Sequence, residues 1–115
     1  MADLPFSEFY QKNGFVFISG QVPLKSDGNL IESKDIHEHT DQAMKNLRRI
    51  LKKAGLDFSS VVMTNIYLAD IDDFSKVNEV YIKHLKKPYP ARVTVGVKAL
   101  PLGARIEISM IASKK

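Results

Sequence analysis

Residues Pro90 to Ile108 read PARVTVGVKALPLGARIEI, and this stretch sets single charges inside two strand-like runs of Val, Ile and Ala. The first run alternates with a period of two, so Arg92 and Thr94 share one face and the valines share the other. The second run alternates in the same way and carries Glu107. A guanidinium suits a small carboxylate, and a carboxylate can hold water or move a proton. The stretch predicts two strands and a site for a small organic acid; a cross-strand ion pair and two unrelated surface charges are the alternatives.

Composition bounds the class of protein. A length of 115 residues predicts one domain, spanning 1–115, and 44% hydrophobic with 26% charged residues is typical of an ordinary soluble protein. The absence of cysteine excludes disulfides, thiolate nucleophiles and thiolate metal sites. No apolar segment is long enough to span a bilayer, and the N-terminus lacks the pattern of a signal peptide, so we expect a cytoplasmic protein without a membrane partner. A net charge of +4 favours acidic partners in general.

Periodicity alternates between two and 3.6 along the chain. A strand from Phe15 is followed by a tight turn at Asp27 and Gly28, after which we expect a short second strand. Residues 35–54 carry an apolar stripe typical of a helix that packs on a sheet, and Gly55 ends this helix. Val61 to Leu68 predicts a third strand. We expect a second helix that begins after Asp70 or Asp72 and ends before Pro88; its inner face should carry Phe74, Val77, Tyr81, His84 and Leu85.

The predicted fold is therefore α+β, a two-layer sandwich in which two helices cover one face of a mixed sheet. Phe15 to Ile18 and Val61 to Leu68 are apolar on both sides, whereas two helices can cover only one. The other face should be covered by further copies of the chain, which predicts an oligomer.

Three other features have both a functional and a structural interpretation. The basic residues of the first helix could bind nucleic acid, but they lie largely off the apolar stripe and near the helix C-terminus, as in an ordinary solvated helix. His37 and His39 are two residues apart and so point in different directions, which disfavours a shared metal. Asn78 falls on the inward stripe of the second helix, where its amide is either a structural brace or a support for a site.

Four segments resemble the reactive intermediate deaminase family, RidA-like proteins formerly grouped as YjgF. They are PFSEFYQKNGFVFISGQVP at Pro5 to Pro23, AGLDFSSVV at Ala54 to Val62, DFSKVNEVY at Asp73 to Tyr81, and PARVTVGVKALPLGARIEI at Pro90 to Ile108. The resemblance covers nearly the whole chain. It implies a chorismate-mutase-like fold, a homotrimer with interfacial sites, no cofactor, no metal, and hydrolysis of 2-aminoacrylate- or 2-iminobutanoate-type enamines and imines to 2-oxo acids and ammonia.

The resemblance also assigns roles by position. Arg92 is similar to the family's carboxylate-binding arginine, and Glu107 to the acid that positions or activates water. Ser19 and Gly20 match the loop that lines the pocket, Asn78 its supporting amide, and Thr94 the residue beside the arginine that is often cysteine.

One position departs from the family pattern. Phe6 stands where active members usually carry a tyrosine, and Tyr10 is not at the matching position. The loss of that hydroxyl bears on substrate orientation and turnover. The alternative function is a non-catalytic trimer that binds small carboxylates or a partner protein, or a member of the same fold that acts on RNA.

Overall fold

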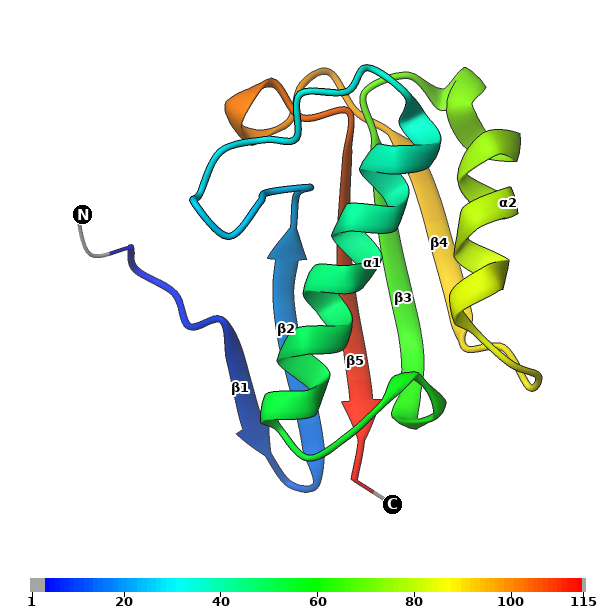
Figure 1. Cartoon of the computed structure of the whole chain (residues 1–115). Coiled ribbons are helices and arrows are strands. Elements are labelled where there is room, and N and C mark those ends of the chain that lie inside the picture. Colours follow the sequence, from blue (N-terminus) through cyan, green and yellow to red (C-terminus); the bar gives the residue numbers. More distant parts are fainter. Residues whose placement is uncertain (1–3, 115) are drawn as a thin grey trace.

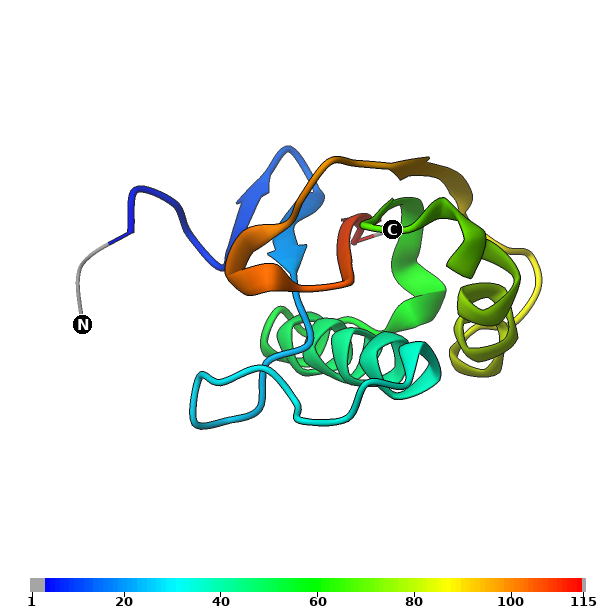
Figure 2. The same ribbon diagram turned by 90° about the horizontal axis from the view of Figure 1, so that it is seen from above.

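The computed structural model describes residues 4–114, which form one five-stranded mixed sheet and two helices (Figure 1). The sheet order is β1-β2-β5-β3-β4, in which β3 and β4 are parallel and the other pairs antiparallel. Both helices lie on the same side of the sheet, as the view from above shows (Figure 2). The strands are β1 (Phe9–Lys12), β2 (Phe15–Gln21), β3 (Val61–Leu68), β4 (Ala91–Gly96) and β5 (Ile106–Ser113), and the helices are α1 (Ile36–Lys53) and α2 (Phe74–His84). The predicted α+β arrangement is confirmed.

The N-terminal strands differ from the prediction. β1 was not expected, yet it pairs with β2 through a turn at Asn13 and Gly14, whose φ angles are 52° and 81°. Two positive φ angles are what a two-residue hairpin requires, and Asn-Gly favours them. The strand expected after the Asp27-Gly28 turn is wrong, because only one bridge, between Leu24 and Leu30, forms there. The polar residues that follow Ile31 supply no apolar side chains for a sheet face.

The core lies between the helices and the sheet. α1 starts where the Asp35 side chain accepts a hydrogen bond from the backbone N–H of His37, and it ends before Gly55, whose φ is 78°. Its predicted stripe is buried, and it packs on β2 and β5. α2 follows a short 3-10 turn, which Asp70 caps, so the helix begins at Phe74.

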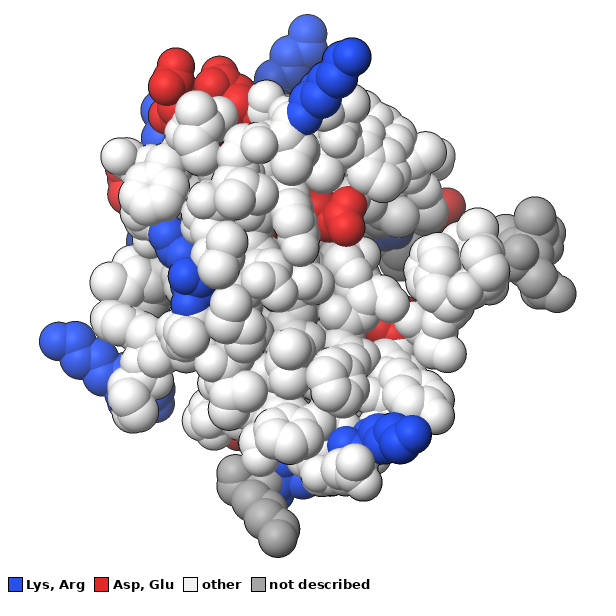
Figure 3. Space-filling model, turned by 180° about the vertical axis from the view of Figure 1, so that it is seen from behind, with Lys and Arg blue, Asp and Glu red and all other residues white. Residues whose placement is uncertain are grey.

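The face of the sheet opposite the helices carries apolar side chains. Phe17 and Val95 are 43% and 39% exposed there, with Phe15 and Val93 similarly exposed. From behind, the centre of this face is mainly uncharged and most Lys and Arg side chains lie toward its rim (Figure 3). We call this surface the open face. No helix within residues 4–114 is long and apolar enough to cross a membrane.

Candidate functional site

Arg92 lies on β4, on the face that the helices cover. Its register partner on β3 is Thr64, which is fully buried and hydrogen-bonded to Tyr81 of α2. The guanidinium carbon is 5.3 Å from the ring centroid of Phe74 and 5.0 Å from that of Tyr81. Within the described residues no carboxylate forms an ion pair with Arg92, so its charge contacts aromatic rings only. Its N–H groups remain available to an anion.

Two polar atoms on the same side of the molecule are buried and have no hydrogen-bond partner among residues 4–114. They are Oδ1 of Asn78, on α2, and Oγ1 of Thr94, two residues beyond Arg92 on β4. Buried polar atoms normally find a hydrogen-bond partner, so these two are candidates to contact a ligand. A pocket of about 320 Å³ opens between α2 and β4, and its lining residues are Asn78, Tyr81, Ile82, Tyr89, Pro90 and Arg92.

Glu107 lies on β5 on the open face, half-buried beside a bulge in β2. The bulge falls between Ile18 and Gln21 and brings Gly20 close to the carboxylate. A β-carbon at Gly20 would lie 2.0 Å from Oε2 of Glu107, so only glycine fits there without moving the glutamate. Burial raises the pKa of the Glu107 carboxyl above its ordinary value. Within residues 4–114 no side chain or backbone N–H donates to this carboxylate.

Arg92 and Glu107 do not meet within one chain. On β3, Arg92 pairs with Thr64 and Glu107 pairs with Tyr67. Positions 64 and 67 are three residues apart, and side chains alternate between faces along a strand, so Arg92 and Glu107 point to opposite faces of the sheet. Two strand spacings and three residue steps put their Cα atoms about 14 Å apart. The cross-strand ion pair considered as an alternative is therefore wrong. Arg92 and Glu107 therefore belong to two separate groups of candidate site residues, which we call the arginine half-site and the glutamate half-site.

Ser19 directly precedes Gly20 of the glutamate half-site and is hydrogen-bonded to the segment that follows Phe6. The Ser19 hydroxyl donates to the backbone oxygen of Ser7 at 2.6 Å, and the Ser19 N–H donates to the backbone oxygen of Glu8. Ser19 thus anchors the segment that carries Phe6, whose ring is 63% exposed. The structure places Ser19, Gly20 and Glu107 together on β2 and β5, and it places Arg92, Thr94 and Asn78 together on β4 and α2.

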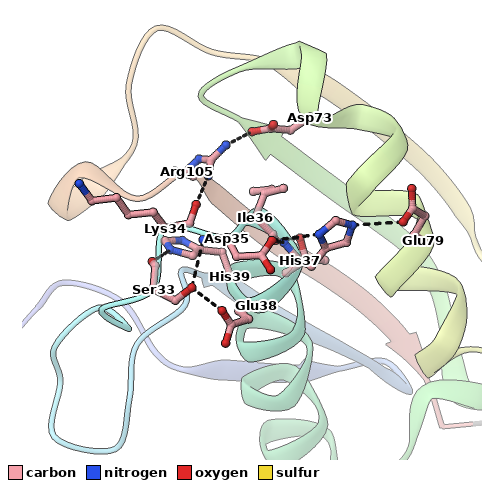
Figure 4. Close-up of polar contacts among 11 residues, drawn as sticks. Ser33, Lys34, Asp35, Ile36, His37, Glu38, His39, Asp73, Glu79 and Arg105 are labelled. Carbon is pink, nitrogen blue, oxygen red and sulfur yellow. Dashed lines mark hydrogen bonds and ion pairs between the residues drawn. The ribbon is translucent and has the colours of Figure 1, made fainter.

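A polar bridge connects the elements that carry the two half-sites (Figure 4). Arg105, two residues before Glu107, donates to Asp73 at 2.7 Å and to the backbone oxygen of Lys34. Asp73 is 6% exposed and directly precedes Phe74. The bridge therefore ties the start of β5 to the start of α2 and to the loop before α1.

The roles of two residues in the arginine half-site were not predicted. Phe74 and Tyr81 were expected on the inner face of the second helix, which is correct for Tyr81, but Phe74 is 41% exposed and its ring contacts Arg92. The available signal was the spacing of Phe74, Asn78 and Tyr81, which puts two rings and an amide on one helix face. His84, by contrast, is packed as predicted, between Asp41 and Arg48. Among the described residues no group of His, Asp and Glu side chains is arranged to hold a metal ion.

The chain is similar to a family of known proteins over its whole length. The profile of the family described as Endoribonuclease L-PSP matches residues 1–114. Reactive Intermediate Deaminase A, chloroplastic, of Arabidopsis thaliana is 46% identical over 109 residues, which cover 95% of this chain and 58% of that protein. A human protein named 2-iminobutanoate/2-iminopropanoate deaminase is 43% identical over 94% of this chain and 79% of its own length. The crystal structure of RidA from an Antarctic Psychrobacter superposes with a TM-score of 0.91 at 34% identity, covering 98% of this chain and 91% of that one.

Proposed function

We propose that this chain, which belongs to the Endoribonuclease L-PSP family that includes the reactive intermediate deaminases, hydrolyses 2-imino acids to 2-oxo acids and ammonia. The substrates would be 2-aminoacrylate- and 2-iminobutanoate-type enamines and imines. The names of the relatives support this activity. The observation that carries it here is the Arg92 guanidinium, which borders a pocket between α2 and β4 and has no carboxylate partner within the described residues.

Arg92 would bind the substrate carboxylate through two parallel N–H···O hydrogen bonds. Glu107 would accept a proton from water as the water oxygen bonds to the imine carbon, and the imine nitrogen would take up a proton. The resulting carbinolamine loses ammonia when its C–N bond breaks and its hydroxyl becomes the carbonyl of the 2-oxo acid. A pKa raised by burial makes the Glu107 carboxylate more basic than an ordinary one, which suits it to receive and return that proton.

We infer that the two half-sites of one reaction centre come from different copies of the chain in a homotrimer. Arg92 and Glu107 point to opposite faces of one sheet, so a single copy cannot place both against one small substrate. The apolar open face gives a second copy a surface to cover. In a closed ring, each chain would supply its arginine half-site to one neighbour and its glutamate half-site to the other.

RNA cleavage, which the family description names, receives less support from the charges. Glu8 forms ion pairs with Arg49 and Lys53, and Asp41 pairs with Lys45 on the outer side of α1. Arg48 donates to His84. Carboxylates and a histidine thus engage four of the five basic side chains of α1, which favours a small-molecule substrate over nucleic-acid binding by this helix.

The test mixes two inactive variants. Arg92→Lys keeps the charge but lacks the two-pronged hydrogen bonding, and Glu107→Gln cannot accept the proton, so each alone should lose most activity toward an imine generated by a pyridoxal-phosphate dehydratase. When the two are unfolded together and refolded at equal amounts, about a quarter of the interfaces should combine an intact Arg92 with an intact Glu107.

Activity should then return to about a quarter of the parent value, which is the fraction of intact interfaces expected in a ring. Simple mixing without refolding is the control. Full activity of either single variant would exclude the proposed roles. If the refolded mixture stays inactive although both variants assemble correctly and the parent protein regains activity after the same refolding, a site shared between copies is excluded.

A further inference from the structure

One face of α2 provides two aromatic rings for Arg92. Phe74, Asn78 and Tyr81 follow one another at spacings of four and three residues, so they occupy neighbouring turns on the same side of the helix. That side faces β4, where the guanidinium carbon lies 5.3 Å from the Phe74 ring and 5.0 Å from the Tyr81 ring. We call these two rings the aromatic bracket.

The Tyr81 ring is held at both ends. Its body is buried in the core, and its hydroxyl donates to Oγ1 of Thr64 at 2.9 Å. Thr64 is fully buried and is the register partner of Arg92 on the neighbouring strand. The ring is therefore fixed to the same part of the sheet that carries the arginine.

Phe74 has a different environment. Its ring is 41% exposed at the first residue of α2, outside the main core cluster. A ring exposed to this extent buries less apolar area than a core ring, so core packing accounts for only part of its placement. Its other contact is with the Arg92 guanidinium.

We propose that Phe74 and Tyr81 are positioning residues, which hold the guanidinium of Arg92 in one orientation before a carboxylate binds. This proposal rests on the proposed function only for the identity of that carboxylate. A contact with a ring face attracts the cation and leaves its N–H groups free for an anion. An arginine already ordered by its neighbours loses less conformational freedom on binding, so the bracket raises affinity for the carboxylate.

The experiment compares three variants by the dissociation constant of 2-oxobutanoate, measured by calorimetry. Phe74→Leu removes the exposed ring and should weaken binding about 3- to 10-fold, the range for a partly exposed cation–π contact. Phe74→Tyr keeps a ring and should bind like the parent. Phe58→Leu is the matched control, because it removes a ring 5.8 Å from the guanidinium carbon of Arg48, away from the site, and should leave binding unchanged.

A second measurement needs no ligand. The side-chain Nε–H signal of Arg92, identified by its disappearance in Arg92→Lys, should show a ring-current shift that Phe74→Leu reduces and Phe74→Tyr retains. Unchanged binding and an unchanged Arg92 signal in Phe74→Leu would overturn the positioning role, as would an equal loss in Phe58→Leu.

These results are distinguishable from a failure of the proposed function. A parent protein that binds 2-oxobutanoate but does not hydrolyse imines would overturn the deaminase proposal and leave the bracket supported. If the parent does not bind 2-oxobutanoate, the Arg92 signal alone decides the positioning role.

Discussion

Among single residues, Glu107 has the clearest link between environment and charge. Burial raises its pKa in the folded chain, so the neutral form is favoured there relative to the unfolded chain. The stabilisation that protonation brings is complete below the unfolded pKa and is lost as pH rises through the folded pKa. At neutral pH the ionised carboxylate therefore reduces the stability of the fold.

We predict that Glu107→Gln raises the melting temperature at pH 7 and that this gain shrinks toward pH 4, where the parent glutamate is itself becoming neutral. The same substitution should lower imine hydrolysis by about 10²-fold or more. Thermal unfolding across that pH range and a turnover assay provide the two measurements. A lower melting temperature at pH 7 would show that the carboxylate stabilises the fold, contrary to this account.

Gly20 is the second residue with a specific expectation. Its backbone is not in the left-handed region, so the obstacle to a β-carbon there is the Glu107 carboxylate, 2.0 Å away. We predict that Gly20→Ala displaces Glu107 and reduces turnover, while the same change costs much less stability in a Glu107→Ala background. A double-mutant cycle by chemical denaturation should give a coupling free energy of about 1 kcal/mol or more. Additive effects would mean that the glutamate simply rotates away.

Among elements, the bridge from Arg105 to Asp73 holds β5 and α2 together. Its acid is buried and its guanidinium is partly exposed, so Arg105→Met would leave an unpaired buried carboxylate. We predict a loss of about 2 kcal/mol in the free energy of unfolding, measured with urea. Asp73→Asn in the same chain should recover part of it, because a neutral amide is easier to bury.

Arg49→Met is the matched control for this prediction. Arg49 also pairs with a carboxylate, that of Glu8, but at 3.4 Å and with both side chains in solvent. An exposed pair of this kind is worth about 0 to 1 kcal/mol. Equal losses in the two methionine variants would contradict a special role for the buried bridge.

Some elements and contacts were predictable from sequence and others were not, for physical reasons. α1 was predictable because its apolar stripe, the cap at Asp35 and the stop at Gly55 all agree. β1 was missed because a four-residue strand with three exposed positions lacks a periodic apolar signal. Arg92 and Glu107 were recognisable as site candidates on their strands, but their opposite faces depend on the register of each with β3, which local sequence does not specify.

At the scale of the whole molecule, the open face leaves apolar side chains in contact with solvent in a single copy. Phe17 and Val95 are partly exposed there, which is unfavourable in a monomer. We predict that sedimentation equilibrium gives three times the 12.9 kDa mass of the chain at micromolar concentration. Val95→Lys should dissociate the assembly and abolish turnover, since a cation would be buried against apolar side chains. A monomeric parent that retains activity would exclude the shared site.

The order of strands has a consequence for how the chain folds. β5, the last of the five strands along the sequence, lies at the centre of the sheet, and its register pairs Ser113 with Phe15. While the chain is being synthesised, the hairpin of β1 and β2 and the pair of β3 and β4 have no strand to join them until β5 emerges. During that time the unpaired strand edges and apolar side chains of the two outer pairs are exposed, and the two pairs must not associate with each other prematurely. Contacts between such distant residues slow folding, so this is a chain for which a chaperone would act mainly before the last strand is inserted.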